Sequence, residues 1–565
     1  MLSRTWPGAL AILLCISHAG PAQTTQKFDV VIAGGSTAAF AAAIAAADTG
    51  ARTALLEPTD WVGGQLTSSG VPAVDEAWHK VTDPKTGEVV NVSAIARARA
   101  NMTPNFRALL DATGNPGRGW VSNYCFLPKD FLDTQLIPLE RKAGPRLVVF
   151  RETVLKGVET DPETRRIRSI TAIRRKPKKG LTYGGYDRLL SQDLEDWYDP
   201  RTSDRFDKET LRFEAAVFIE ATEWGELLAL ADAPYLQGVE ATDGGPQGED
   251  HCGQATVIDF VQRLNAGPVE EPKHAEGVDR LGFGPYEGRA DAWERIWTYR
   301  RVKGFGAKPT PGDLSLQNWG YAESKGSGGN DYPFGYLFLS KRDTAEQRKD
   351  WRGGVNLAVV AGAEERAFAW HDWFRDHPQG DVEPGQVTLE IGPLGTGHGL
   401  AKLPYVRDTR RSIGLDGYLL TLKDLRGPAS QRTGKRFRDR IALGAYAADI
   451  HPMVGCKFPQ SGGETLPFYV PFRALTNEGF GNLLMAGKTM AQSFQANSAT
   501  RLHPIEWSTG TAAGVAAAHM ATNGLDSRQA LARIDELQDL IRAKTPIDWT
   551  IDGVKYPAPD EETSF

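Results

Sequence analysis

The sequence predicts an α/β fold in which two widely separated segments form one domain and the chain between them forms another. Residues 28–57 have the pattern strand, tight turn, helix, strand, and residues 479–524 return to a strand followed by a helix. Residues 145–178 alternate apolar and polar side chains. A chain of 565 residues, 41% of them hydrophobic, is too long for one small core, so we expect two joined domains.

The first residues have the pattern of a cleavable signal peptide. Arg4 precedes an apolar run over residues 9–16, and small residues follow it. We predict a signal peptide over residues 1–22, and hence a periplasmic or secreted protein. No later stretch is apolar for the roughly 20 residues of a membrane-spanning helix. The formal net charge of −6 gives no nucleic-acid signature. We therefore expect no membrane span and no nucleic-acid partner.

Residues 28–57 predict a Rossmann-like unit that binds a pyrophosphate. The uncharged strand over residues 30–33 ends at Gly34 and Gly35, and an alanine-rich helix over residues 36–48 follows. Free backbone N–H groups and the helix dipole at such a helix start attract phosphate. We expect Gly34 to make the tight turn that brings the chain to this site.

Two of the three glycines that such turns usually carry are replaced here. Ser36 occupies the position where the backbone approaches the phosphate, and Ala39 the position of close helix–strand packing. Both replacements are small, and a serine hydroxyl can donate to a phosphate oxygen. Glu57, at the end of the second strand, lies where an acid accepts the ribose hydroxyls of a dinucleotide.

We predict a discontinuous first domain, residues 28–234 and 440–545, with a β-meander at about residues 145–215. Residues 235–439 lose the βαβ rhythm and are predicted to form a mixed α+β cap domain that covers the substrate. Six tryptophans lie close together in this region: Trp293, Trp297, Trp319, Trp351, Trp370 and Trp373. Tryptophan faces can stack on sugar rings, but we expect most of these side chains to form the core of the cap.

Residues 28–523 resemble, discontinuously, the FAD-dependent oxidoreductases, and in particular an exported branch with a Gly-Gly-Ser or Gly-Gly-Thr turn. The resemblance rests on "AGGSTAA", on the loop "PTDWVGGQLTSSG", on "VFIEATEWGELLALADAPY", on "AKLPYVRDTRR" and on the C-terminal strand and helix, which we expect to open at about Ser508. It implies a glutathione-reductase-like fold and FAD as cofactor. The cofactor-binding residues that it implies are Gly34, Gly35, Ser36, Thr37, Ala38, Glu57, Gly64, Gln65, Thr67, Val154, Ala221, Gly487, Gly510, Ala512 and Ala513.

Each group of these residues has an implied role. The turn from Gly34 to Ala38 would contact the pyrophosphate, Val154 the adenine, and residues 64–67 the flavin. Gly487 would lie near the ribityl chain. The N–H groups of residues 510–513 would face the flavin's N1 and C2 carbonyl, where a positive helix end stabilises the reduced ring.

Histidines and arginines near the returning segment are the candidates for chemistry. His451 and His503 are candidate bases, and Arg407, Arg473 and Arg501 could clamp a carboxylate or polarise a carbonyl. Acidic neighbours that simply neutralise the arginines are an alternative for each of them. These five residues are our predicted catalytic set.

The cysteines exclude several kinds of metal site. Cys125, Cys252 and Cys456 show no Cys-x-x-Cys spacing, which excludes a zinc ribbon or an iron–sulfur cluster of that type. We predict no metal site. One long-range disulfide is compatible with an oxidising compartment and would leave one free thiol.

These observations predict an exported FAD-dependent oxidoreductase. Its substrate is expected to be a small organic molecule, an acidic carbohydrate being favoured by the arginines, that transfers hydride to flavin N5. The electron acceptor is left open between oxygen, a quinone and a carrier protein, since no second nucleotide-binding loop is evident. Two alternatives stay open: a flavin enzyme for non-redox elimination or isomerisation of carbohydrates, and a flavin-bearing carbohydrate-binding protein.

Overall fold

The computed structural model describes most of the chain. The described residues are 24–77, 80–82, 87–239, 250–275, 283, 290–320, 328–427, 432–456, 458 and 463–556. The predicted signal peptide lies outside them, so its prediction is untested. Within these residues, no helix combines the length and the apolar character that crossing a membrane requires.

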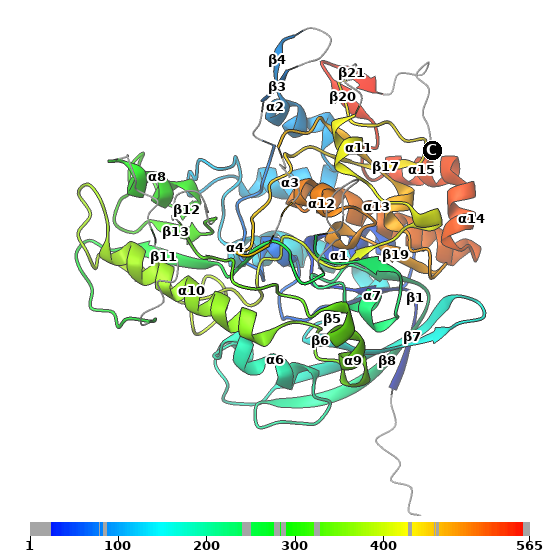
Figure 1. The fold of residues 1–565 in the computed structure, drawn as a ribbon, viewed down its shortest axis with the longest axis horizontal. Coiled ribbons are helices and arrows are strands. Elements are labelled where there is room, and N and C mark those ends of the chain that lie inside the picture. Colours follow the sequence, from blue (N-terminus) through cyan, green and yellow to red (C-terminus); the bar gives the residue numbers. More distant parts are fainter. Residues whose placement is uncertain are drawn as a thin grey trace, which may run out of the picture.

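A seven-stranded sheet forms the centre of the fold (Figure 1). Its strands run in the order β5 (Leu147–Phe150), β2 (Thr53–Leu56), β1 (Thr24–Ala33), β8 (Phe206–Glu220), β7 (Arg166–Pro177) and β6 (Thr153–Asp161), with β19 (Leu483–Met485) also paired to β8. Strands β5, β2, β1, β8 and β19 pair in parallel. Strands β6, β7 and β8 pair antiparallel, as expected for a meander. This is the α/β, Rossmann-like arrangement that the sequence predicted.

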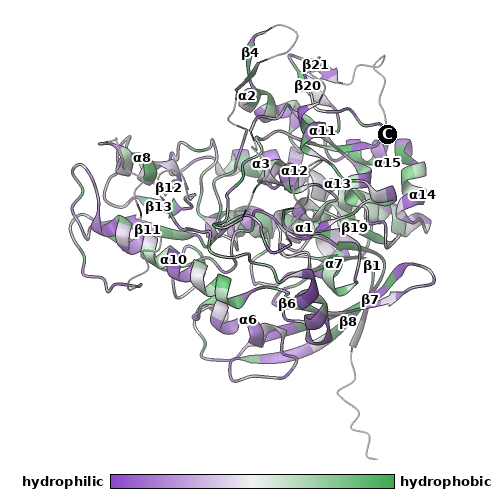
Figure 2. Cartoon of the chain, viewed as in Figure 1, coloured by the Kyte–Doolittle hydropathy of each residue, from purple (hydrophilic) through white to green (hydrophobic). Residues whose placement is uncertain are grey.

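Strand β8 joins the meander to the parallel sheet. Residues 206–214 pair with β7, whereas residues 211–220 pair with β1 and the last of them also with β19. The meander is therefore an extension of the main sheet. Figure 2 shows many hydrophilic residues on β7 and β8 where they extend away from α1 and α13. That half of the strands has polar side chains because it projects beyond the covering helices.

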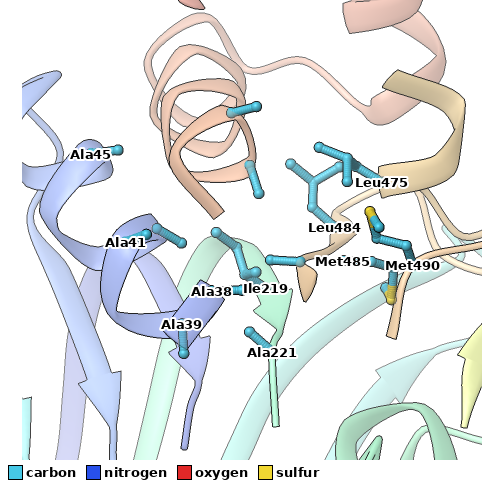
Figure 3. Close-up of a cluster of buried hydrophobic side chains, with 14 of the residues drawn as sticks. Ala38, Ala39, Ala41, Ala45, Ile219, Ala221, Leu475, Leu484, Met485 and Met490 are labelled. Atoms are coloured by element: carbon cyan, nitrogen blue, oxygen red, sulfur yellow. The ribbon is translucent and has the colours of Figure 1, made fainter. Parts of the chain in front are cut away.

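Helices α1 (Thr37–Asp48) and α13 (His503–Asn523) pack tightly against each other and the sheet. Figure 3 shows Ala38 and Ala41 of α1 beside Ile219 of β8 and Leu484 of β19. A Cβ on Gly510 would lie 2.3 Å from the carbonyl oxygen of Ala38. Only small side chains allow this approach, which explains the alanine and glycine content of both helices.

A second region lies beside the first and contains a four-stranded antiparallel sheet. Its strands run in the order β12 (Arg301–Lys303), β13 (Leu314–Gln317), β11 (Phe260–Leu264) and β15 (Val387–Leu389), and the helices α8 (Ala292–Tyr299) and α10 (Leu357–Asp376) pack nearby. Four of the six tryptophans are fully buried: Trp293, Trp297, Trp351 and Trp370. They form core, as expected for most of the six. The predicted domain boundaries stay predictions.

The remaining elements are short helices and strand pairs. The helices are α2 (Val92–Arg97), α3 (Pro104–Thr113), α4 (Pro128–Phe131), α5 (Ile137–Ala143), α6 (Leu190–Tyr198), α7 (Glu226–Leu230), α9 (Lys341–Gln347), α11 (Leu422–Arg426), α12 (Phe494–Thr500), α14 (Ser527–Ala532) and α15 (Ile534–Arg542). The short strand pairs are β3 (Lys80–Thr82) with β4 (Val89–Asn91), β9 (Tyr235–Leu236) with β16 (Arg411–Ser412), β10 (Thr256–Val257) with β14 (Asp331–Tyr332), β17 (Arg440–Gly444) with β18 (Phe468–Pro471), and β20 (Trp549–Ile551) with β21 (Val554–Tyr556).

One disulfide joins distant parts of the chain. Cys252 and Cys456 are bonded, and Cys125 is a buried free thiol. The sequence allowed one such bond and one free thiol, and the structure selects the pair.

Candidate active site

Three predicted cofactor residues line one narrow cavity at the start of α1. Gly34, Gly35 and Val154 share it with Thr222 and Glu223, among other residues. Gly34 follows β1, Val154 opens β6 and residues 222–223 follow β8, so the carboxyl ends of two parallel strands meet here. Ligands of open α/β sheets bind at this edge.

The two turn glycines are required for different reasons. Gly35 has φ +119°, a conformation that other residues rarely adopt. Gly34 has no such φ, but a Cβ there would lie 2.7 Å from the carbonyl oxygen of Leu56 in β2. The reversal of the chain is therefore made at Gly35, while Gly34 permits the close approach of the two strands.

The hydroxyls of Ser36 and Thr37 donate to backbone carbonyls, whereas the sequence suggested that the Ser36 hydroxyl could donate to a phosphate. Ser36 caps α1 by accepting from the N–H of Ala39 at 3.0 Å, and its Oγ donates to the carbonyl of Ala221 at 2.7 Å. Thr37 Oγ1 donates to the carbonyl of Gly63 at 2.7 Å. Both hydroxyl protons are thus used by backbone. The N–H groups of the first turn of α1, and no serine hydroxyl, are left to meet a phosphate.

Glu57 is a buried carboxylate directly after β2. It is 1% exposed, and its Oε1 accepts from the backbone N–H and the Oγ1 of Thr59 at 3.3 and 3.2 Å. Burial raises its pKa to about 8. A carboxyl group that is this well shielded from water needs hydrogen-bond donors, and the hydroxyls of a ribose can supply them.

The loop after β2 folds back onto the start of α1. Gly64 has φ +56°, and a Cβ there would lie 2.6 Å from both the Cα of Ser36 and the amide nitrogen of Thr37. Thr67 Oγ1 donates to the carbonyl of Val62 at 2.6 Å, and Gln65 Nε2 donates to the carbonyl of Arg501 at 3.1 Å. The loop is therefore fixed at both ends.

Gly487 packs closely against α1. It has φ +67°, and a Cβ there would lie 2.8 Å from the Cβ of Ala38 and 3.1 Å from Glu506 Oε1. The predicted residues Gly64, Gly487 and Ala38 are thus brought together with the turn, although they come from three distant segments of the sequence.

Gly510, Ala512 and Ala513 require a correction. Helix α13 begins at His503, five residues before the predicted start at Ser508. The free N–H groups of a helix belong to its first turn, so those of residues 510–513 bond within the helix. Gly510 instead packs on Ala38. The proline at position 504 marks the true start, because proline is favoured in the first turn of a helix. The prediction of a start at Ser508 did not use this signal.

A buried group of charges that the sequence analysis missed lies beside this turn. Lys488 Nζ lies 2.7 Å from Glu223 Oε2 and 3.0 Å from Glu506 Oε1, and all three side chains are buried. Although burial opposes the charged form, the two carboxylates raise the pKa of Lys488, while burial raises the pKa of Glu223 to about 7. The sequence offered one signal for this group of charges, which is the lysine that directly follows Gly487 in "LLMAGK".

A second, polar cavity of about 240 Å³ contains three of the five predicted catalytic residues. Arg407, Arg501 and His451 line it together with Asp75, Tyr299, Arg300, Asn318, Trp319, Gly320, Tyr405, Tyr446 and Asp449. These residues come from the loop that follows residues 64–67, from the second region, and from the segment that returns to the first region. The cavity is therefore shared by the two regions of the fold.

His451 is held between two carboxylates. Its Nδ1 lies 2.7 Å from Asp331 Oδ2 and its Nε2 lies 3.1 Å from Asp449 Oδ2. Burial and Arg407 oppose a charge on the ring, but Asp449 and Asp331 prevail and raise the pKa of His451. Both ring nitrogens then carry protons that face carboxylates. This geometry makes His451 a positive charge at the cavity wall and not the base that the sequence analysis expected.

The two arginines are held differently. Arg407 pairs with the fully buried Asp331 at 2.8 Å and donates to the carbonyl of Ala255 at 2.9 Å. Arg501 donates from Nη1 to the hydroxyl of Tyr405 at 2.6 Å and pairs with Asp449 at 3.1 Å. Although burial opposes its charge, these partners raise the pKa of Arg501. Both guanidinium groups are positively charged at the cavity.

His503 and Arg473 are corrections to the predicted catalytic set. His503 is fully buried, its Nε2 donates to the carbonyl of Val71 at 2.8 Å, and its Nδ1 accepts from the N–H of Asp75 at 3.2 Å. Burial lowers its pKa to about 4, so it is a neutral clamp on the loop. Arg473 lies outside the cavity and pairs with the buried Asp439 at 2.9 Å.

One family model matches nearly the whole described chain. The match covers residues 29–184 and 201–541, and the family is described as FAD dependent oxidoreductase. The chain belongs to this family. FAD is therefore its cofactor, and the flavoprotein prediction is confirmed. No curated protein matches the sequence.

Solved structures match this chain at low similarity. Mycobacterium smegmatis Sdh1 in complex with UQ1 has 13% identity and a TM-score of 0.34, with 91% of this chain and 72% of that chain covered. A mutated E. coli quinol fumarate reductase FrdA has 12% identity and a TM-score of 0.33, with 91% and 74% covered. A geranylgeranyl bacteriochlorophyll reductase-like protein from Thermoplasma acidophilum has 12% identity and a TM-score of 0.30, with 92% and 82% covered.

The residues around the start of α1 fit FAD. Several buried polar atoms near this turn have no hydrogen-bond partner among the described residues: Gln65 Oε1, Ser69 Oγ, Glu223 Oε1, both carboxylate oxygens of Glu506, and the donors Trp197 Nε1 and Trp224 Nε1. Most of them are acceptors, which match ribityl hydroxyls and the flavin N3–H. These atoms and the close-packed glycines at positions 35, 64 and 487 would form the cradle for the dinucleotide.

Proposed function

We propose that this FAD-dependent oxidoreductase acts on a small anionic substrate, with an acidic sugar as the favoured class. The single observation that carries the proposal is an excess of donors in the polar cavity. Arg300 Nε and Arg501 Nε are buried there and have no acceptor among the described residues. A guanidinium donor that lacks an acceptor is matched by a carboxylate, which takes paired hydrogen bonds.

The charge of the cavity wall supports the same substrate class. Three arginines and the protonated His451 line it against two aspartates, Asp75 and Asp449, with Asp331 behind them. The volume of about 240 Å³ is below the roughly 300–1,000 Å³ of sites for drug-sized ligands. Trp319, which is partly exposed, offers a face on which a sugar ring can stack.

The proposed division of roles follows from the contacts. Arg501 and Arg300 bind the acid group of the substrate, and His451 holds a positive charge beside it. Burial raises the pKa of Tyr405, so its phenol keeps its proton. Since Arg501 donates to the oxygen of Tyr405, the phenol proton is free to be donated elsewhere. FAD, when bound, supplies the acceptor of the hydride.

The position of the cavity supports its use with the flavin. Gln65 of the cradle bonds to the main chain of Arg501, and Lys488 lies 5.8 Å from the ring of Tyr405. The cradle and the cavity therefore share a wall. The electron acceptor, whether oxygen, a quinone or a carrier protein, stays an open part of the proposal.

We also propose that the protein is exported. The disulfide between Cys252 and Cys456 supports this, because disulfides persist mainly in oxidising compartments. Expression of the full chain, followed by mass spectrometry of the protein recovered outside the cytoplasm, checks it. A mature chain that begins near residue 23 is the expected result, and retention of Met1 in the cytoplasm would contradict it.

The decisive experiment compares matched acidic and neutral sugars. Anaerobic glucuronate is expected to bleach the flavin absorption of the purified protein, whereas glucose is expected to leave it unchanged. Equal bleaching by both sugars, or by neither while another class of compound bleaches the flavin, would overturn the proposed substrate class. Turnover without bleaching and without an external acceptor would favour the non-redox alternative. Binding of a sugar without bleaching of the flavin and without turnover would favour a carbohydrate-binding protein.

A further inference from the structure

Two histidines and a glutamate converge far from the cavity described above. Glu271 and His274 lie in the segment after β11, and His371 lies in α10. One ligand atom from each lies within 4.8 Å of the other two. His371 is fully buried, whereas the side chains of His274 and Glu271 are 21% and 13% exposed. The group is therefore enclosed but reachable.

The surroundings of His371 prepare its Nε2 to be a ligand. Nδ1 lies 2.7 Å from the amide of Gln262, and Gln262 Oε1 has no hydrogen-bond partner among the described residues. Turning this amide about its last bond places Oε1 on Nδ1–H. Nε2, which lies 3.0 Å from Glu271 Oε2, then has a free lone pair.

His274 has the same kind of support. Its Nδ1 lies 3.2 Å from Asp372 Oδ1, a contact that places the proton on Nδ1 and leaves Nε2 free. Nε2 faces Glu271 Oε1 at 4.0 Å, beyond hydrogen-bond distance. A carboxylate behind a histidine, with the other ring nitrogen turned toward a common centre, is the usual support of a metal-ligating histidine.

Hydrogen bonds alone explain this group incompletely. A proton on His371 Nε2 would satisfy its contact with Glu271, but Gln262 Oε1 would stay unpartnered and His274 Nε2 would make no bond to Glu271. Arg375 Nη1, 3.4 Å from Glu271 Oε2 and 3.6 Å from Asp372 Oδ1, neutralises part of the charge of the two carboxylates. A cation among the three ligand atoms accounts for the convergence of Glu271 and the two Nε2 atoms on one point.

We propose that Glu271, His274 and His371 bind a divalent transition metal of the zinc type. Two imidazoles and a carboxylate suit zinc and leave a fourth position for water. His274 also lines an open surface cavity, which gives the ion a path of entry. The metal would fasten the segment after β11 to α10 and so stabilise the second region. The absence of Cys-x-x-Cys motifs does not bear on this site, which uses no cysteine.

The test is zinc binding by the full-length, FAD-loaded protein after treatment with a chelator. Wild type is expected to take up one equivalent of Zn²⁺ in competition with a chromophoric chelator, and to raise its midpoint of thermal unfolding. Co²⁺ is expected to give the visible absorption of a four-coordinate site. Asp372→Asn is expected to weaken the affinity about 10–100-fold through His274. His274→Ala should weaken it further.

The matched control is His377→Ala, since His377 is exposed and follows α10 directly. Its zinc affinity is expected to equal that of wild type. The flavin content of each variant reports whether it folds. The proposal is overturned if wild type binds no zinc, or if a flavin-loaded His274→Ala variant binds it as tightly as His377→Ala does. Neither outcome bears on the anionic-substrate proposal.

Discussion

The contact between α1 and α13 and the polar cavity are built by opposite means. In the helix contact, alanines and glycines bring backbone close to backbone, as at Gly510 and Ala38. In the cavity, arginines, aspartates and a charged histidine are buried at the cost of desolvation. The helix contact excludes side chains and so brings α1 and α13 close together. The cavity keeps charge, and we propose that this charge selects an anionic substrate.

The largest expected effect removes charge from the cavity. Arg501→Leu is expected to lower kcat/KM for an anionic substrate by roughly 30- to 4,000-fold, since losing one partner of a buried charge pair costs about 2–5 kcal/mol. Steady-state kinetics measure it. Arg473→Lys, which keeps the ion pair with Asp439 outside the cavity, is expected to match wild type. Equal kinetics for both variants would remove Arg501 from the substrate site.

The second-largest expected effect concerns His503, the first residue of α13. The pKa of His503 is lowered by burial to about 4 from about 6.5, so the folded protein prefers the neutral ring. Stability from this group is full above pH 6.5 and is lost as the pH falls toward 4, by roughly 3 kcal/mol. His503→Gln is expected to remove this part of the pH dependence in urea unfolding. The same pH slope in both proteins would contradict the neutral clamp.

Overpacking the helix contact should have a smaller effect. Gly510→Ala places a methyl group against the carbonyl of Ala38 and is expected to lower the free energy of unfolding by about 1–3 kcal/mol. Urea unfolding with and without FAD measures it. Gly267→Ala, at a position with open space around the new Cβ, is the matched control and should stay within about 0.5 kcal/mol of wild type. Equal losses would show that the contact tolerates side chains.

The smallest effect is a pH dependence of substrate binding. Because Asp449 and Asp331 raise the pKa of His451, its charge persists to a higher pH than that of a free imidazole and is lost as the pH rises through the raised pKa. KM for an anionic substrate is then expected to rise about tenfold, the equivalent of roughly 1.5 kcal/mol for one interaction with a charged group. His451→Gln should flatten this profile. A KM that falls with rising pH would assign the opposite role to His451.

Local patterns predicted the nucleotide-binding unit well. The run from residue 28 to Glu57 fixed a strand, a turn, a helix and a strand, and the structure confirms each of them. The helix start near Ser508 was wrong because a single proline was given too little weight as a first-turn residue. The hydroxyl of Ser36 was assigned to a phosphate because the sequence does not show the carbonyl of Ala221 beside it.

The candidate site depended more strongly on distant contacts. Both histidines were equally plausible bases in the sequence. Their states differ because His451 meets two carboxylates and His503 meets backbone groups. Arg473 and Arg501 both lie in the returning segment, but only Arg501 reaches the cavity. The partner of a charged side chain decides its role, and partners far apart in the sequence leave no local pattern.

By itself the sequence determined the α/β class and the strand–turn–helix–strand unit, because periodicity, glycine positions and helix propensity act over a few neighbouring residues. The FAD-dependent family followed from the resemblance of its motifs to those of known oxidoreductases. The tertiary structure alone decided which cysteines pair, which of two histidines is charged and which three arginines share a cavity. These outcomes depend on burial and on distances between segments hundreds of residues apart. Electrostatic free energies follow such distances and not the spacing along the chain.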